Sequence, residues 1–123
     1  MNIVDSSGWL EYFAGTRNGA IFGKPIQNLH ELLVPTITLA EVFKKVLLER
    51  DEESAFQAVA YMRRGRIVDM DASIAVEAAK FGFQFKLPLA DSIIYATAKQ
   101  YHAVLWTQDE DFKGLESVKY VPK

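Results

Sequence analysis

The chain has 123 residues, half of them hydrophobic, which is enough for one ordinary core and too little for a second, so we expect a single domain covering residues 1–123. The absence of cysteine excludes disulfides, thiolate zinc sites and cysteine nucleophiles. The formal net charge of −2, from 14 Lys and Arg against 16 Asp and Glu, argues against binding of nucleic acid over the whole surface. Any such contact must therefore be local.

The sequence has no pattern of export or membrane insertion. No stretch approaches the roughly 18 uninterrupted apolar residues of a membrane span. An acid stands at position 5, and no basic segment precedes a long apolar run, which is unlike a secretory signal. We therefore expect a cytoplasmic protein that does not associate with a membrane.

Strand and helix patterns alternate from the first residues onward. Residues 2–5 form a short apolar run that meets two serines, which predicts a strand, a tight turn and a helix. Residues 18–32 predict two short helices, because a glycine and a proline interrupt their apolar pattern. Residues 33–36 predict the second strand. Thr38 is expected to cap the amphipathic helix that follows, in which apolar residues recur every three or four positions.

The second half of the chain continues this alternation. A helix at about 53–64 is expected to bury Phe56 and to end at a left-handed Gly65, before a strand at 66–70. The pattern then predicts a helix at 72–81 ending at Gly82, a helix from Pro88 to about Tyr101, a strand at 103–107, a turn with a short helix at 108–113 and an edge strand at 119–121.

Repeated strand–helix–strand units connect parallel strands, so the order of elements predicts an α/β fold. The expected architecture is a three-layer α/β/α sandwich with a mainly parallel sheet of four to five strands. In such sheets the functional site lies beyond the carboxyl ends of the strands.

Four acids are predicted to meet at this edge of the sheet. Asp5 ends the first strand, and Asp109 follows the strand at 103–107. Glu41 lies one turn into the helix after the second strand, and Asp91 lies in the first turn of the helix that begins at Pro88. Taken singly, most of these acids also fit as ordinary cap or turn residues.

Together, the four carboxylates would repel by on the order of 4 kcal/mol per close pair at an effective dielectric near 20. A hard divalent cation such as Mg²⁺ or Mn²⁺ relieves this repulsion, because it prefers oxygen ligands and bridges carboxylates to phosphate. The sequence therefore predicts a cation site that acts on phosphate esters.

Other residues are candidates for supporting roles. Ser6 and Thr107 are placed to orient a carboxylate, and Ser6 serves equally well as a helix cap. Asp111 is a further acid near the cleft, although it also fits the first turn of the short helix. Lys44 and Lys45 follow Glu41 and are candidates for contacts with substrate phosphates, with a solvated helix face as the alternative. Lys44 is preferred of the two, because it lies one turn on from Glu41.

Four sequence blocks, VDSSGWLEYF, PTITLAEVFKK, LPLADSIIYATA and WTQDEDF, resemble in order and spacing the signature blocks of PIN domains, most closely those of VapC-type toxins. The resemblance implies that Asp5, Glu41, Asp91 and Asp109 hold one or two Mg²⁺ or Mn²⁺ ions, with support from Thr107. It also implies an endoribonuclease with an RNA substrate, the toxin of a type II toxin–antitoxin pair, a small antitoxin partner and a homodimer. The last block also contains Glu110, so the resemblance leaves open which acid of that block binds the metal.

Three alternatives remain from the sequence. One is a PIN nuclease that processes RNA outside a toxin–antitoxin pair. Another is a phosphoacceptor signalling domain, although such domains place paired acids after the first strand and a lysine after the fifth. The third is a non-catalytic module whose acidic pocket receives a basic peptide. For a partner-binding groove, the candidate residues are Trp9, Phe13, Phe43 and Leu47.

Overall fold

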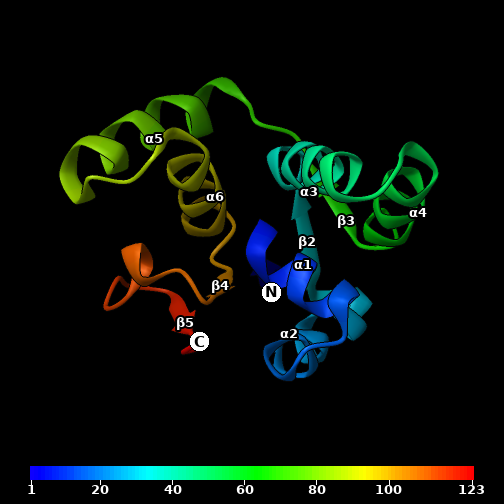
Figure 1. Ribbon diagram of the computed structural model, residues 1–123. Coiled ribbons are helices and arrows are strands. Elements are labelled where there is room, and N and C mark those ends of the chain that lie inside the picture. Colours follow the sequence, from blue (N-terminus) through cyan, green and yellow to red (C-terminus); the bar gives the residue numbers. More distant parts are fainter.

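The computed structural model describes residues 1–123 and contains one sheet of five parallel strands (Figure 1). The strands are β1 (Asn2–Val4), β2 (Leu32–Pro35), β3 (Arg66–Val68), β4 (Val104–Thr107) and β5 (Val118–Tyr120), in the order β3-β2-β1-β4-β5. The α-helices are α1 (Ser6–Ala14), α2 (Arg17–Gln27), α3 (Thr36–Glu49), α4 (Glu52–Met62), α5 (Ala72–Phe85) and α6 (Leu89–Gln100). Two 3-10 turns, η1 (Leu29–Glu31) and η2 (Glu110–Phe112), complete the chain.

Helices cover both faces of the sheet, as the uninterrupted apolar pattern of its central strands requires. Ile3 of β1 belongs to the core on the side of α5, α6 and η2, while its neighbour Val4 belongs to the core beneath α1 to α4. Because adjacent strand residues point to opposite faces, a strand covered on both sides is apolar throughout. The predicted three-layer α/β/α sandwich is confirmed. None of its helices combines the length and the apolar character needed to cross a bilayer.

The prediction of two short helices over residues 18–32 was wrong about where the break falls. A single helix, α2, runs through Gly23 and Pro25, and the chain bends at Asn28 before the short turn η1. The glycines of α2 serve helix packing instead. A Cβ atom on Gly19 would lie 2.2 Å from the carbonyl oxygen of Glu11, so α1 and α2 approach too closely for any side chain there.

Three further local expectations were also wrong. Thr38 does not cap α3, which begins at Thr36; its hydroxyl donates to the carbonyl of Pro35 at 2.7 Å. Gly65 has no positive φ, but a Cβ there would lie 2.9 Å from the side chain of Val34. Gly82 does not end α5 and instead faces the Ser92 hydroxyl of α6, 2.8 Å from where its Cβ would stand.

The predicted burial of Phe56 on α4 was also wrong. Its side chain is 58% exposed and packs edge-to-face against Phe43 of α3, with ring centroids 4.9 Å apart. The smaller Ala55 and Ala58, together with Met62, form the buried face of α4. The apolar character of Phe56 therefore did not indicate the buried face of this helix.

Candidate active site

The candidate site lies where β1 and β4 end, at the centre of the sheet. These strands are neighbours, and the chain leaves β1 for α1 on one face and leaves β4 for η2 on the other. Such a divergence opens a crevice at the carboxyl ends of parallel strands. Asp5 follows β1 and Asp109 follows β4, so the sheet itself brings these two acids together.

Asp5 is almost entirely buried, with 4% of its surface exposed, and it caps the N-terminus of α1. One carboxylate oxygen accepts from the backbone N–H of Gly8 at 2.9 Å and from the Ser7 hydroxyl at 3.0 Å. The other accepts from the Thr107 hydroxyl at 2.5 Å. Burial raises the pKa of Asp5 despite these hydrogen bonds, which act in the opposite direction.

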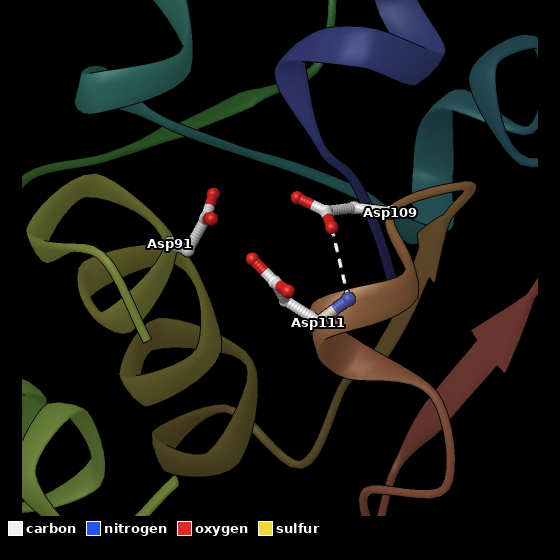
Figure 2. A group of neighbouring side chains, drawn as sticks. All are labelled: Asp91, Asp109 and Asp111. Atoms are coloured by element: carbon white, nitrogen blue, oxygen red, sulfur yellow. Dashed lines mark hydrogen bonds between the residues drawn. The ribbon is translucent and has the colours of Figure 1, made fainter. Parts of the chain in front are cut away.

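Thr107 links the two strands that carry acids. Its buried hydroxyl donates to Asp5 and also accepts from the backbone N–H of Asp109 at 3.0 Å. One side chain thus sets the distance between the end of β1 and the loop after β4. Asp109 in turn caps η2 by accepting from the backbone N–H of Asp111 at 2.9 Å (Figure 2).

Three carboxylates converge above this loop. Figure 2 shows Asp91 on α6 facing Asp109 and Asp111 from the other side of the crevice. Oxygens from all three lie within 4.8 Å of one another. The pKa of Asp91 is raised to about 7, first by burial and then by the negative charges of Asp109, Glu41, Asp5 and Asp111.

The four acids predicted from the sequence, Asp5, Glu41, Asp91 and Asp109, line one cleft of about 290 Å³. Asp111 is exposed and does not line the cleft, but one of its oxygens lies close to those of Asp91 and Asp109. Glu110 is also exposed and outside the lining, and it does not belong to this group of carboxylates. The turn of η2 directs Asp111 toward α6, an orientation that the sequence pattern does not reveal.

Glu41 is held in the cleft by Ser6. The Ser6 hydroxyl donates to the Glu41 carboxylate at 2.5 Å and thereby joins α1 to α3. Of the two lysines expected to contact substrate, Lys45 lines the cleft, and it also pairs with Glu49 one turn further along α3, at 3.0 Å. Lys44 is exposed and lies outside the cleft lining.

Sequence reasoning missed Ser7, which supports Asp5, and Gln108, which joins the loop after β4 to α1 and α2. Ser7 donates to Asp5, and its position two residues after the acid is a recognisable turn signal. Gln108 is buried beside Asp109, accepts from the Asn18 amide at 2.9 Å and donates to Glu11 at 3.3 Å. No local pattern marks Gln108, because both of its partners are distant in the sequence.

A second hollow of about 390 Å³ lies next to the acidic cleft, between α1, α3 and α4, and Leu10 lines both. Of the proposed groove residues, Phe13 lines this hollow. Trp9 belongs instead to the core, 1% exposed, while Phe43 packs against Phe56 and Leu47 lies outside the lining.

Neighbouring strands that connect to opposite faces of a sheet form a switch point, and many α/β proteins have their functional site in the crevice there. Comparison with known families shows to which of these proteins the chain is related. The model of the PIN domain matches residues 3–117, so the chain belongs to the PIN domain family. No curated protein sequence matches the chain.

Solved structures share the fold over nearly the whole chain. A toxin–antitoxin complex from Klebsiella pneumoniae is 24% identical with a TM-score of 0.79, covering 97% of this chain and 96% of that one. DNA-bound VapBC from Salmonella typhimurium is 15% identical with a TM-score of 0.77, covering 98% and 96%. Mycobacterium tuberculosis VapC20, described as a toxin that cleaves the sarcin–ricin loop, is 14% identical with a TM-score of 0.77, covering 100% and 98%.

Proposed function

We propose that this protein is a Mg²⁺- or Mn²⁺-dependent endoribonuclease that acts as the toxin of a type II toxin–antitoxin pair. The observation that carries the proposal is the convergence of Asp5, Glu41, Asp91 and Asp109 on one cleft at the switch point of the sheet. Membership of the PIN domain family supports the nuclease class. The similar structures from toxin–antitoxin complexes, and the one described as an RNA-loop-cleaving toxin, support the RNA substrate and the toxin role.

The residues of the cleft fit a hard divalent cation. The candidate ligand atoms of the acids are all carboxylate oxygens, which Mg²⁺ and Mn²⁺ prefer. The pKa of Asp91 is raised in part by four neighbouring carboxylates, a repulsion that a cation would remove. We assign Asp91, Asp109 and Asp5 as the principal ligands, with Glu41 and Asp111 at the border of the site. The bound cation would supply Lewis-acid charge to the phosphodiester and to the attacking water.

The protein's own groups orient the acids and receive the substrate. Thr107 and Ser7 hold Asp5 in one rotamer, and Ser6 does the same for Glu41. Hydroxyl donors of this kind direct the remaining lone pairs of a carboxylate toward a ligand. Lys45, at the rim of the cleft, is the cation placed to contact an RNA phosphate.

The test of the nuclease is RNA cleavage by the purified chain with Mg²⁺, Mn²⁺ or EDTA. Asp5→Asn and Asp91→Asn are each expected to lower the cleavage rate at least about 100-fold, which corresponds to about 2.7 kcal/mol of barrier. Glu53→Gln on α4 is the matched control, because Glu53 is an exposed acid outside the cleft. Cleavage that persists in EDTA, or full activity in both site variants, would contradict the proposal.

The toxin role has a separate test in cells. Induction of the chain alone is expected to arrest growth, and the arrest should require the same acids as RNA cleavage. A short open reading frame directly before the gene would supply the antitoxin, and its co-expression should restore growth. If the chain cleaves RNA but does not affect growth, the nuclease proposal stands and the toxin role is excluded.

A further inference from the structure

A third hollow, of about 380 Å³, shares α1 with the two hollows described above but is bounded by different elements. Its walls come from α1, from the start of α2, from the loop after β4 and from the residues that follow β5. No apolar residue lines it, and we call it the polar hollow. The lining residues are Glu11, Thr16, Arg17, Asn18, Gln108 and Lys123.

Hydrogen bonds between distant segments hold the walls of the polar hollow together. The Asn18 amide donates to the side-chain oxygen of Gln108 at 2.9 Å and to the carbonyl of Pro122 at 3.1 Å. The Gln108 amide donates to one carboxylate oxygen of Glu11 at 3.3 Å, and the Thr16 hydroxyl donates to the other at 2.7 Å. Gln108 is itself only 6% exposed. The hollow is therefore shaped in advance of any ligand, which lowers the cost of binding one.

The polar hollow has more basic than acidic side chains, unlike the other two hollows. Arg17 and Lys123 line it, and the salt bridges of the chain include neither of them. Its single acid, Glu11, already accepts hydrogen bonds at both carboxylate oxygens. The acidic cleft, in contrast, has only Lys45 against four carboxylates. Two cations without a carboxylate partner favour an anion with several acceptor oxygens, such as a phosphate.

The polar hollow and the acidic cleft are neighbours at two places in the fold. On α1, Ser7 lines the cleft and Glu11 lines the hollow, and side chains four residues apart on a helix are about 5–6 Å apart. After β4, Asp109 lines the cleft and the adjacent Gln108 lines the hollow. Each strand of a nucleic-acid duplex carries a phosphate about every 3.4 Å along its axis. An RNA strand bound in the cleft therefore has a further phosphate within reach of the hollow.

We propose that the polar hollow binds a backbone phosphate of the RNA substrate close to the cleaved bond, with Arg17 and Lys123 as its charged contacts. The inference rests on the proposed nuclease function, which makes RNA the ligand. It also accounts for a difficulty of that function, because the carboxylates of the cleft repel the phosphates on either side of the one that reacts. The polar hollow attracts one of these phosphates and so positions the strand across the cleft.

The first test is binding of a fluorescently labelled single-stranded RNA of mixed sequence, with Mg²⁺ and the Asp91→Asn chain so that the RNA stays intact. Adding Arg17→Gln or Lys123→Gln should weaken binding at least about threefold and should make the dependence of log affinity on log salt shallower by up to about 0.7. Lys24→Gln is the matched control, because Lys24 is an exposed cation of α2 outside the hollow. No measurable binding, or equal effects of all three substitutions, would overturn the proposal.

The second test identifies the phosphate by cleavage of an RNA whose cut bond has been mapped. Uncharged methylphosphonates replace the phosphates on either side of that bond, one at a time. At one position the replacement should slow the natural chain at least about threefold but should not slow Arg17→Gln further, because the same contact is lost only once. Independent effects at every position would overturn the polar hollow and leave the nuclease proposal intact. A natural chain that cleaves no RNA contradicts the nuclease proposal itself, and the binding test then decides the hollow.

Discussion

Replacement of Asp91 by asparagine should stabilise the metal-free protein at neutral and alkaline pH. Burial and the four neighbouring carboxylates raise the pKa of Asp91 from 3.8 to about 7. The folded chain therefore keeps a proton that the unfolded chain has already lost between these two pH values. The stability associated with this proton is fully present below pH 3.8 and is lost as the pH rises through about 7. Asparagine remains neutral throughout and avoids that loss.

The expected size of the effect follows from the shift. A change of roughly three pKa units would correspond to about 4 kcal/mol for a fully insulated group. Asp91 is only half-buried, so screening by solvent reduces the expected gain to about 1–2 kcal/mol at pH 8. For a domain of this size, that gain raises the melting temperature by about 3–8 °C. Near pH 4 the two proteins should unfold at nearly the same temperature.

The measurement is thermal unfolding of EDTA-treated protein between pH 4 and pH 8, with Glu53→Gln as the control for loss of one surface acid. Addition of Mn²⁺ should then reverse the order, because the cation stabilises the natural chain more than a variant that lacks one ligand. If Asp91→Asn lowers the melting temperature at pH 8, or if the difference from the natural chain does not change with pH, the electrostatic account of the cleft is wrong.

Three other substitutions probe what holds the site in place. Thr107→Val removes the donor to one oxygen of the buried Asp5 carboxylate, so it should lower the free energy of unfolding by about 1–3 kcal/mol and also slow RNA cleavage. Thr97→Val removes a hydroxyl bonded within α6 and should leave the specific cleavage rate unchanged, so equal rates in both variants would contradict the role of Thr107. Gly19→Ala should lower the free energy of unfolding in urea by about 1–3 kcal/mol, because the new Cβ would overlap the carbonyl of Glu11. An unchanged urea midpoint would show that α1 and α2 can move apart without cost. Phe112, the last residue of η2, has its ring in the core, so Phe112→Ala should lower the free energy of unfolding by about 3–5 kcal/mol in the same measurement. A loss below about 1 kcal/mol would mean that this ring does not anchor η2.

Local patterns in the sequence were sufficient for the sheet and for its acidic edge. Strand and helix periodicity indicated the alternating order, and parallel connections then required Asp5 and Asp109 to end at the same edge. This inference works because it needs only the direction of each strand, which the connections determine. The position of Glu41 followed from the same rule, since α3 comes directly after β2 and begins at that edge. Asp91 reaches the edge in another way, because α6 follows α5 and runs back toward the start of β4.

The glycines show where sequence patterns fail. Gly82 and Gly65 look like helix terminators, yet the structure uses them where two segments approach too closely for a side chain. A glycine that ends a helix and a glycine that admits a neighbouring element have the same local signature. The distinction lies in the distant partner, Ser92 for the first and Val34 for the second, and no window of sequence contains that information.

The sequence predicted which types of residue form the site. Tertiary structure decided which of two adjacent residues in the chain takes part in it. Acids after strands were enough to predict an oxygen-rich cation site. Only the packing of α3 against α1 decided that Lys45 and not Lys44 lines the cleft, and only the turn of η2 brought Asp111 to Asp91. The physical reason is that neighbouring residues on a helix or turn point in directions about 100° apart, so the choice between them depends on which face the rest of the fold covers.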